Sequence, residues 1–218
     1  MKKLLYLLLL TPIIYLTSCS KSSVTPEVEN LYGCTDTLAF NFDSLVTVDD
    51  SSCSYQMTYV PDDNFEQGLI NLGYDNVLDD SVYTTSIQYV TSLNLNYKNI
   101  NSLLGIEDFT ALEYLNCSVN QITSLDVSQN TLLDSLDCCG NLLTSLDVSQ
   151  NTNLIALYCH VNQLTNLDIS NGNNTNFTLF WAGSNDSLNC IEVDDSVWFT
   201  NNWQDNLDNN QYYSNSCQ

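Results

Sequence analysis

Cysteine, histidine and aspartate side chains come close together in one part of this chain, and they are its most reactive groups. Cys139 lies 21 residues before His160, the only histidine, and Asp137 precedes Cys139 by two residues. A thiol beside an imidazole and a carboxylate can act as a nucleophile with its base, or supply two ligands to a zinc ion. The sequence shows no oxyanion hole, no enclosing loop and no second histidine to complete either site. A surface thiol beside an imidazole, free or in an intermolecular disulfide, is the simpler interpretation.

The spacing of these residues follows a repeat. Three consecutive segments superimpose, namely LEYLNCSVNQITSLDVSQNTL from Leu112, LDSLDCCGNLLTSLDVSQNTN from Leu133 and LIALYCHVNQLTNLDISNGNN from Leu154. A unit of this length cannot bury a hydrophobic face alone, so the units must stack into a solenoid. The shared pattern L-x-x-L-x-C-x-x-N-x-L resembles the leucine-rich repeat, with Cys in one Leu position. This resemblance implies a right-handed coil of about five units with a parallel β-sheet on its concave face.

Each position in the repeat has a physical reason. Alternation along a short strand turns Leu115 and Cys117 to the core, and Asn116 and Ser118 to solvent. The stacked Cys117, Cys138 and Cys159 are expected to be buried thiols, because their parallel side chains suit a disulfide poorly. Asn120, Asn141 and Asn162 are expected to form a ladder that satisfies backbone groups. The T-S-L-D-V-S segment that follows predicts an extended back to each coil.

The units at both ends of the array are imperfect, as the caps of a solenoid are. Lys98 replaces the ladder Asn in the first unit, and Phe177, Phe180, Ala182 and Asn185 continue the pattern after the last full repeat. Before the array, Asp62 precedes a helical pattern of apolar residues that ends near Gly73, and its acids are expected to cap the helix. Behind the array, four aromatic side chains are expected to plug the last coil: Trp198, Phe199, Trp203 and Tyr212.

The N-terminus predicts export. Lys2 and Lys3 precede an apolar run, and the sequence L-T-S-C ends at Cys19. This pattern resembles the bacterial lipobox, in which the peptide is cut before a cysteine that becomes acylated. The alternative is an ordinary signal peptide with a coincidental cysteine. We expect residues 1–18 to be the lipoprotein signal peptide and residues 19–31 the lipidated Cys19 with a polar tether.

The net charge of −22, with 26 acidic residues against 4 lysines and arginines, excludes some partners. A field of this sign repels nucleic acid and anionic head groups, so we expect no nucleic-acid partner and membrane contact only through the lipid. Acidity of this kind is typical of exported proteins. No cofactor is expected, although abundant oxygen ligands leave calcium open.

The segment GCTDTLAFNFDSLVTVDDSSC resembles a short module, G-C-x-D-x-x-A-x-N-[YF]-x-x-x-A-x-x-D-D-G-S-C, found in exported bacterial proteins. So small a unit buries little surface, and a disulfide between Cys34 and Cys53 is expected to hold it. Its Asp and Asn residues either form turns or hold calcium. A second disulfide, between Cys190 and Cys217, is expected to close the C-terminal cap. The expected boundaries are residues 32–56 for the module, 57–89 for the N-terminal cap, 90–187 for the repeats and 188–218 for the C-terminal cap.

Together these features resemble a family of bacterial cell-envelope leucine-rich repeat lipoproteins that are internalin-like in the broad sense. The resemblance covers nearly all of the chain after Cys19. It implies an outer-membrane lipoprotein, monomeric and not an enzyme, that binds a protein or glycan on its concave sheet. The sequence leaves open whether it faces the periplasm or the exterior.

The outward positions of the sheet are the expected ligand site. Strand alternation predicts one row of side chains per coil, with a middle column of Asn94, Asn116, Asp137, Tyr158 and Trp181. Aromatic side chains on a rigid polar surface suit sugar rings or protein interfaces. Trp181 is either displayed or covered by the C-terminal cap. The predicted ligand-binding residues are Tyr114, Asn116, Asp137, Tyr158, His160 and Trp181. The alternative is a structural or spacer lipoprotein without a specific ligand, stabilised by calcium.

Overall fold

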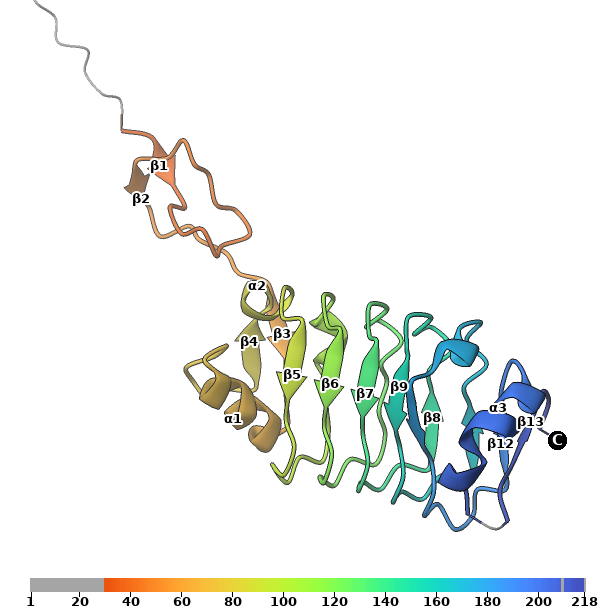
Figure 1. The fold of residues 1–218 in the computed structure, drawn as a ribbon. Coiled ribbons are helices and arrows are strands. Elements are labelled where there is room, and N and C mark those ends of the chain that lie inside the picture. Colours follow the sequence, from red (N-terminus) through yellow and green to blue (C-terminus); the bar gives the residue numbers. More distant parts are fainter. Residues whose placement is uncertain (1–29, 209, 218) are drawn as a thin grey trace, which may run out of the picture.

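The computed structural model describes residues 30–208 and 210–217. A small module is followed by an elongated solenoid with a cap at each end (Figure 1). The predicted signal peptide and Cys19 lie outside the described residues. Among the residues described, no helix has the length and apolar character needed to cross a membrane.

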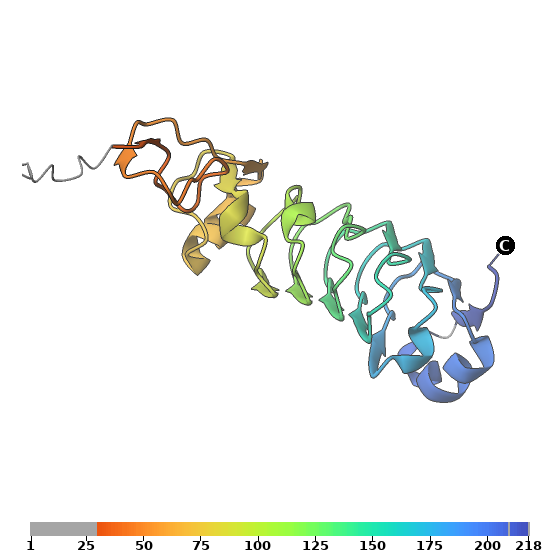
Figure 2. The ribbon, with the colours of Figure 1, turned by 90° about the horizontal axis from the view of Figure 1, so that it is seen from above.

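Five parallel strands, here called the front sheet, carry the Leu-x-Cys segments of the repeats. They stack in the order β11-β9-β7-β6-β5, one strand from each coil (Figures 1 and 2). The central residue of every strand is buried and in register with its neighbours, from Leu93 to Phe180. This arrangement confirms the leucine-rich repeat solenoid. The strands are β5 (Ser92–Asn94), β6 (Tyr114–Asn116), β7 (Ser135–Asp137), β9 (Ala156–Tyr158) and β11 (Leu179–Trp181).

A second parallel sheet, here called the back sheet, follows the opposite side of the coils. It has the order β13-β12-β10-β8, and it confirms the extended back that the T-S-L-D-V-S segments predict. The segment 124–127 in the preceding coil is not a strand. The sheet continues past the repeats into the C-terminal cap. Its strands are β8 (Ser145–Asp147), β10 (Asn166–Asp168), β12 (Cys190–Glu192) and β13 (Tyr212–Ser214).

One hydrophobic core runs the length of the solenoid, between the two sheets. Cys117, Cys138 and Cys159 are fully buried in it as free thiols, which confirms the predicted cysteine ladder. Burial raises the pKa of each of these thiols well above that of an exposed cysteine, so they remain protonated and pack as small apolar groups.

The predicted asparagine ladder satisfies the turn that leaves the front sheet. Asn141 Nδ2 donates to the carbonyls of Cys117 and Cys138, both at 3.0 Å, and its Oδ1 accepts from Ile122 N at 3.0 Å. Asn120, Asn162 and Asn185 make the equivalent bonds in their own coils. Each coil is therefore hydrogen-bonded to the one before it through a buried amide.

A second asparagine ladder, which the sequence analysis did not predict, lies where the chain leaves the back of each coil. Asn151 Nδ2 donates to Val127 O and Asn130 O, and Asn130 and Asn171 donate to the coils before them. Oδ1 of Asn130 and Oδ1 of Asn151 are buried and accept no hydrogen bond from the described residues. The back ladder is thus only half satisfied.

The N-terminal cap consists of a helix and a two-stranded antiparallel sheet, and it is hydrogen-bonded to the first coil. α1 (Asp63–Leu72) is capped at its N-terminus by Asp62, whose Oδ1 accepts from Asn64 N and Phe65 N, and at its C-terminus by Gly73 with φ 82°. Asp62 Oδ2 also accepts from Asn101 N at 2.8 Å and Ser102 N at 3.1 Å, so one carboxylate caps the helix and attaches it to the solenoid. β3 (Met57–Tyr59) pairs antiparallel with β4 (Ser81–Tyr83) on the other side of α1 in the sequence, and α2 (Thr84–Ile87) follows.

The C-terminal cap closes the solenoid with aromatic side chains, as predicted, but with one difference. Phe199 of α3 (Ser196–Trp203) is fully buried, and Trp198 and Trp203 pack against the core. Tyr212 was expected to join them and is instead exposed, because strand alternation in β13 turns Tyr213 inward. A disulfide joins Cys190 of β12 to Cys217. Short 3-10 turns complete the fold at Ile106–Asp108, Asn174–Asn176 and Gln204–Asn206.

Candidate functional site

The middle column of the front sheet is aligned by strand register. Asn94 pairs with Asn116, Asn116 with Asp137, Asp137 with Tyr158, and Tyr158 with Trp181. Neighbouring side chains in this column are one strand spacing apart, about 4.8 Å.

Three members of the column have a structural role. Oδ1 of Asn94, Asn116 and Asp137 each accepts the backbone N–H two residues further on, at 3.2, 3.0 and 3.1 Å. Such Asx turns hold the chain as it leaves the strand. Tyr158 and Trp181 occupy the same position without an oxygen that can form this turn, so the turn does not explain them.

Tyr158, His160 and Trp181 form an aromatic cluster at the C-terminal end of the front sheet. The His160 ring stacks on Trp181 with centroids 4.5 Å apart and planes at 17°, and meets Tyr158 edge-on at 6.4 Å. Trp181 remains 49% exposed although the cap passes beside it, where Asn206 Nδ2 donates to Phe180 O. The cluster therefore presents an aromatic surface to solvent.

His160 is held as a neutral ring. Burial lowers its pKa, and the nearby Asp137 carboxylate opposes that effect only partly. Its Nδ1 is buried and has no hydrogen-bond partner among the described residues. In this environment the imidazole serves as a flat apolar surface for Trp181 more than as a base.

Cys139 is half-buried beside Asp137. Burial, together with a hydrogen bond to the Asp137 carboxylate, raises the pKa of the Cys139 thiol to about 12. A nucleophilic cysteine needs the thiolate, which this environment suppresses at neutral pH. Within the described ranges, no three His, Cys, Asp or Glu side chains gather into a metal site. Cys139, Asp137 and His160 therefore lack the properties of a nucleophile and its base.

The second row of the sheet is occupied by its own hydrogen bonds. Asn116 Nδ2 donates to Tyr114 Oη at 3.3 Å, and Asn116 Oδ1 accepts from Ser118 Oγ at 2.7 Å. Ser118 was expected to face solvent, and this bond instead holds it in a buried position. Of the six predicted ligand-binding residues, the structure gathers Asp137, Tyr158, His160 and Trp181 on neighbouring strands. The side chain of Asn116 is instead held by Tyr114 and Ser118.

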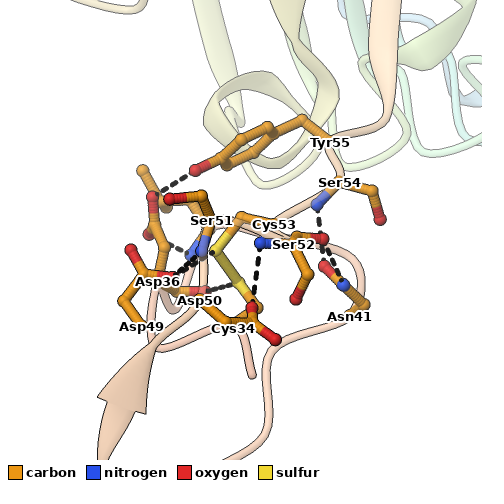
Figure 3. The surroundings of a disulfide bond; sticks show 11 residues. Cys34, Asp36, Asn41, Asp49, Asp50, Ser51, Ser52, Cys53, Ser54 and Tyr55 are labelled. Atoms are coloured by element: carbon orange, nitrogen blue, oxygen red, sulfur yellow. Dashed lines mark hydrogen bonds between the residues drawn. A yellow bond between two sulfur atoms is a disulfide. The ribbon is translucent and has the colours of Figure 1, made fainter. Parts of the chain in front are cut away.

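The N-terminal module uses its acidic side chains in turns (Figure 3). A disulfide joins Cys34 to Cys53, and β1 (Tyr32–Gly33) pairs with β2 (Val48–Asp49). Asp36 Oδ2 accepts from Tyr55 Oη at 2.7 Å, which raises the pKa of Tyr55 to about 12. Asp36, Asp43, Asp49 and Asp50 each accept a backbone N–H two residues further on, between 2.9 and 3.0 Å. Turn formation thus accounts for these aspartates.

The aspartates of the T-S-L-D-V-S segments, on the back of the coils, have the same explanation. Asp126, Asp147 and Asp168 each accept the N–H of the serine two residues further on. Shallow hollows between these coils are lined by Ser124, Ser145 and the same aspartates. Their aspartates are the turn-forming groups of the repeat.

A left-handed rim, which the residue types do not predict, borders the front sheet. The residue before each ladder position has positive φ: 55° at Tyr97, 54° at Val119, 64° at Gly140, 54° at Val161 and 56° at Ser184. Only Gly140 suits this conformation, and the two β-branched valines are strained in it. Val119 and Val161 are also exposed. The one sequence feature that could have predicted the positive φ is the position of these residues directly before the ladder residue.

Comparison with known proteins agrees with the repeat pattern. A stretch of 72 residues, 33% of this chain, is 39% identical to internalin J of Listeria monocytogenes serotype 4b, and it spans 8% of that protein's length. The functional domain of InlJ from Listeria monocytogenes, which includes a cysteine ladder, has a TM-score of 0.49 and 28% identity over 64% of this chain and 38% of that one. An internalin, InlF, from the same species has a TM-score of 0.49 and 27% identity over 62% of this chain and 44% of that one. No protein-family model matches the chain. The matching stretch of 72 residues is internalin-like in sequence.

Proposed function

We propose that this protein is a non-enzymatic, lipid-anchored recognition protein of the bacterial cell envelope. Its front sheet binds a protein or glycan partner outside the cytoplasm. One observation carries the proposal: Tyr158 and Trp181 present aromatic surface at positions where the preceding coils have turn-forming Asn or Asp. Aromatic side chains exposed on a rigid sheet are typical of binding surfaces.

Two further features support recognition over catalysis. The Cys139 thiol is protonated at neutral pH, and the His160 ring is stacked on Trp181 and meets Tyr158 edge-on. The similarity of the repeats to internalin J is consistent with a binding role. Since repeat folds serve many partners, the similarity does not identify the ligand.

Partner capture by the soluble chain from Ser20 onward tests the proposal. Tyr158→Asn with Trp181→Asn restores the residue type of the earlier coils, so the fold should be kept, as circular dichroism and Tm will show. We expect capture of a purified partner to weaken at least a hundredfold, about 2.7 kcal/mol for two central aromatic contacts. Tyr212→Asn, an exposed tyrosine on the back sheet, is the matched control and should bind normally.

Unchanged capture by the double variant would remove the front sheet as the binding surface. The alternative, a spacer lipoprotein held by calcium, predicts instead that millimolar calcium raises Tm, because a ligand of the native state stabilises it.

The lipid anchor is tested separately. Metabolic labelling with a palmitate analogue should mark the wild-type protein and not Cys19→Ala. Release of wild type and variant alike into the soluble fraction would contradict lipid attachment. Protease treatment of intact cells then distinguishes exterior from periplasmic orientation.

A further inference from the structure

Among the residues that the structure describes, Lys98 is the single lysine or arginine, and it lies two strands away from the Asp137 carboxylate on the front sheet. The chain contains no arginine, and its four lysines are Lys2, Lys3, Lys21 and Lys98. Lys98 belongs to the first coil, whereas Asp137 lies on β7 in the third strand of the front sheet. Asp137 is half-buried, and its carboxylate accepts two neutral donors from Cys139: the backbone N–H, which bonds to Oδ1 at 3.1 Å, and the thiol. A partly desolvated carboxylate in this position favours a cation brought by a partner.

Aromatic surface begins one strand away from that carboxylate. Tyr158 is in register with Asp137, and Trp181 with Tyr158, so the three side chains form one continuous line. The two steps are about 4.8 Å each. The stack of His160 on Trp181 holds the far end of the line rigid.

We propose that this line, Asp137–Tyr158–Trp181, binds an arginine side chain on the basic surface of a protein partner. The inference rests on the proposed function and specifies its partner. The guanidinium pairs with the Asp137 carboxylate and lies against Tyr158, and the methylene stem packs towards Trp181. Each carboxylate oxygen has two lone pairs, so the two bonds from Cys139 leave room for a bidentate pair.

The chemistry favours arginine over lysine or a sugar. A guanidinium is planar, weakly hydrated and able to stack on an aromatic ring while it hydrogen-bonds in its plane. Lysine offers a strongly hydrated point charge and loses the stacking. A neutral sugar leaves the Asp137 charge unpaired, whereas the net charge of −22 attracts a basic partner over a longer range.

Small probes test this directly in the folded chain from Ser20 onward. The indole N–H signal of Trp181, one of three tryptophans, can be assigned in a nitrogen-15 correlation spectrum by its loss in Trp181→Phe. N-acetyl-arginine methylamide should shift this signal saturably. Nα-acetyl-lysine methylamide, whose side-chain ammonium is free, should bind at least threefold more weakly than the arginine probe. N-acetyl-citrulline methylamide, which has the same shape without the charge, should not saturate.

The repeat supplies matched variants. Asp137→Asn keeps the turn, since Asn94 and Asn116 accept the same backbone bond in their own coils, and it should weaken the arginine probe at least tenfold. Asp147→Asn removes an equal charge from an equivalent turn on the back sheet and should leave binding unchanged. Equal binding of citrulline and arginine, or full binding by Asp137→Asn, would overturn the inference, and so would saturation by methyl glucoside in place of arginine.

The two proposals fail differently. Partner capture that depends on Tyr158 and Trp181 but is unaffected by Asp137→Asn removes the arginine site and retains the front sheet as a recognition surface. Capture that is unaffected by either change removes both.

Discussion

The two asparagine ladders provide a quantitative test of what holds the coils together. Asn141 belongs to the front ladder and Asn151 to the back ladder, and both are buried in the same part of the solenoid. Replacing each with alanine removes the same atoms. The cost should nevertheless differ, because their hydrogen bonds are satisfied differently.

Asn141→Ala leaves a backbone donor unpaired. Ile122 N bonds to Asn141 Oδ1, whereas the carbonyls of Cys117 and Cys138 each keep a second amide donor, from Asn120 and Asn162. One orphaned buried N–H costs about 1–3 kcal/mol, and the lost bonds to the two carbonyls add about 1 kcal/mol each. We expect Asn141→Ala to lose about 3–5 kcal/mol of unfolding free energy.

Asn151→Ala leaves no backbone group orphaned. The carbonyls of Val127 and Asn130 also accept from Asn130 N and Leu133 N, and the unpartnered Oδ1 of Asn151 disappears with the substitution. The two lost bonds cost about 1 kcal/mol each, as at position 141, and removal of the buried, unpartnered Oδ1 offsets part of that cost. The loss of unfolding free energy should therefore be about 1–2 kcal/mol.

Urea denaturation followed by far-ultraviolet circular dichroism measures both changes, with the surface variant Asn153→Ala as reference. The expected order of stability is Asn153→Ala above Asn151→Ala above Asn141→Ala, with similar m-values. Equal losses at positions 141 and 151 would show that amide burial, and not the satisfaction of individual donors, sets the cost.

Three further predictions follow from particular side chains. Val161→Asn should raise the unfolding free energy, measured by urea denaturation, by about 0.5–1 kcal/mol, because Asn tolerates the left-handed conformation better than Val. Gly140→Ala should lower it by about 1 kcal/mol, although the new Cβ has room at 3.4 Å from Val119 Cγ2. A lower unfolding free energy for Val161→Asn would contradict the strain. Glu66→Gln should lower the unfolding free energy by about 2–3 kcal/mol, because the buried carboxylate accepts hydrogen bonds from Asp79 N, Asp80 N and Ser81 N, and an amide cannot accept all three. Glu113→Gln, at an exposed glutamate, is the control. Equal stability of the two variants would exclude this role for Glu66. Cys139 should react with a thiol reagent at pH 8 roughly a thousandfold more slowly than an ordinary cysteine of pKa about 8.5, since a thiol with pKa about 12 has very little thiolate there; rapid labelling of the native protein would contradict its environment.

The sequence was sufficient for the solenoid because its repeat is enforced by burial. Leu115, Leu136 and Leu157 are fully buried and in register, and a shift by one residue would turn each of them to solvent. The same alternation correctly places Tyr158 and Trp181 in one column. The sequence pattern therefore determines both the length of the repeat and which side chains of each strand face the core.

Backbone conformation and hydrogen-bond satisfaction were harder to predict. The left-handed φ of Val161 contradicts its residue type, because the ladder geometry imposes a conformation that valine alone disfavours. Asn171 joins the back ladder one position early in its repeat, so sequence alignment alone does not place it there. Tyr213, and not Tyr212, lies in the core. The last strand is outside the repeat, so no aligned unit indicates which of its side chains point inward.

The repeat also separates structural from functional residues, because every coil solves the same folding problem. Asn94, Asn116 and Asp137 show what the middle column needs, which is an oxygen that accepts the N–H two residues on. In the two coils that follow, Tyr158 and Trp181 occupy this position and cannot accept that bond, so the turn after each strand is less stable. Such a departure is expected where function, and not folding, selects the residue. The aromatic cluster lies beside the C-terminal cap, where Asn206 bonds to the last front strand and braces it. We therefore expect the partner to contact the last three front strands, and substitutions in β5 to leave its binding unchanged.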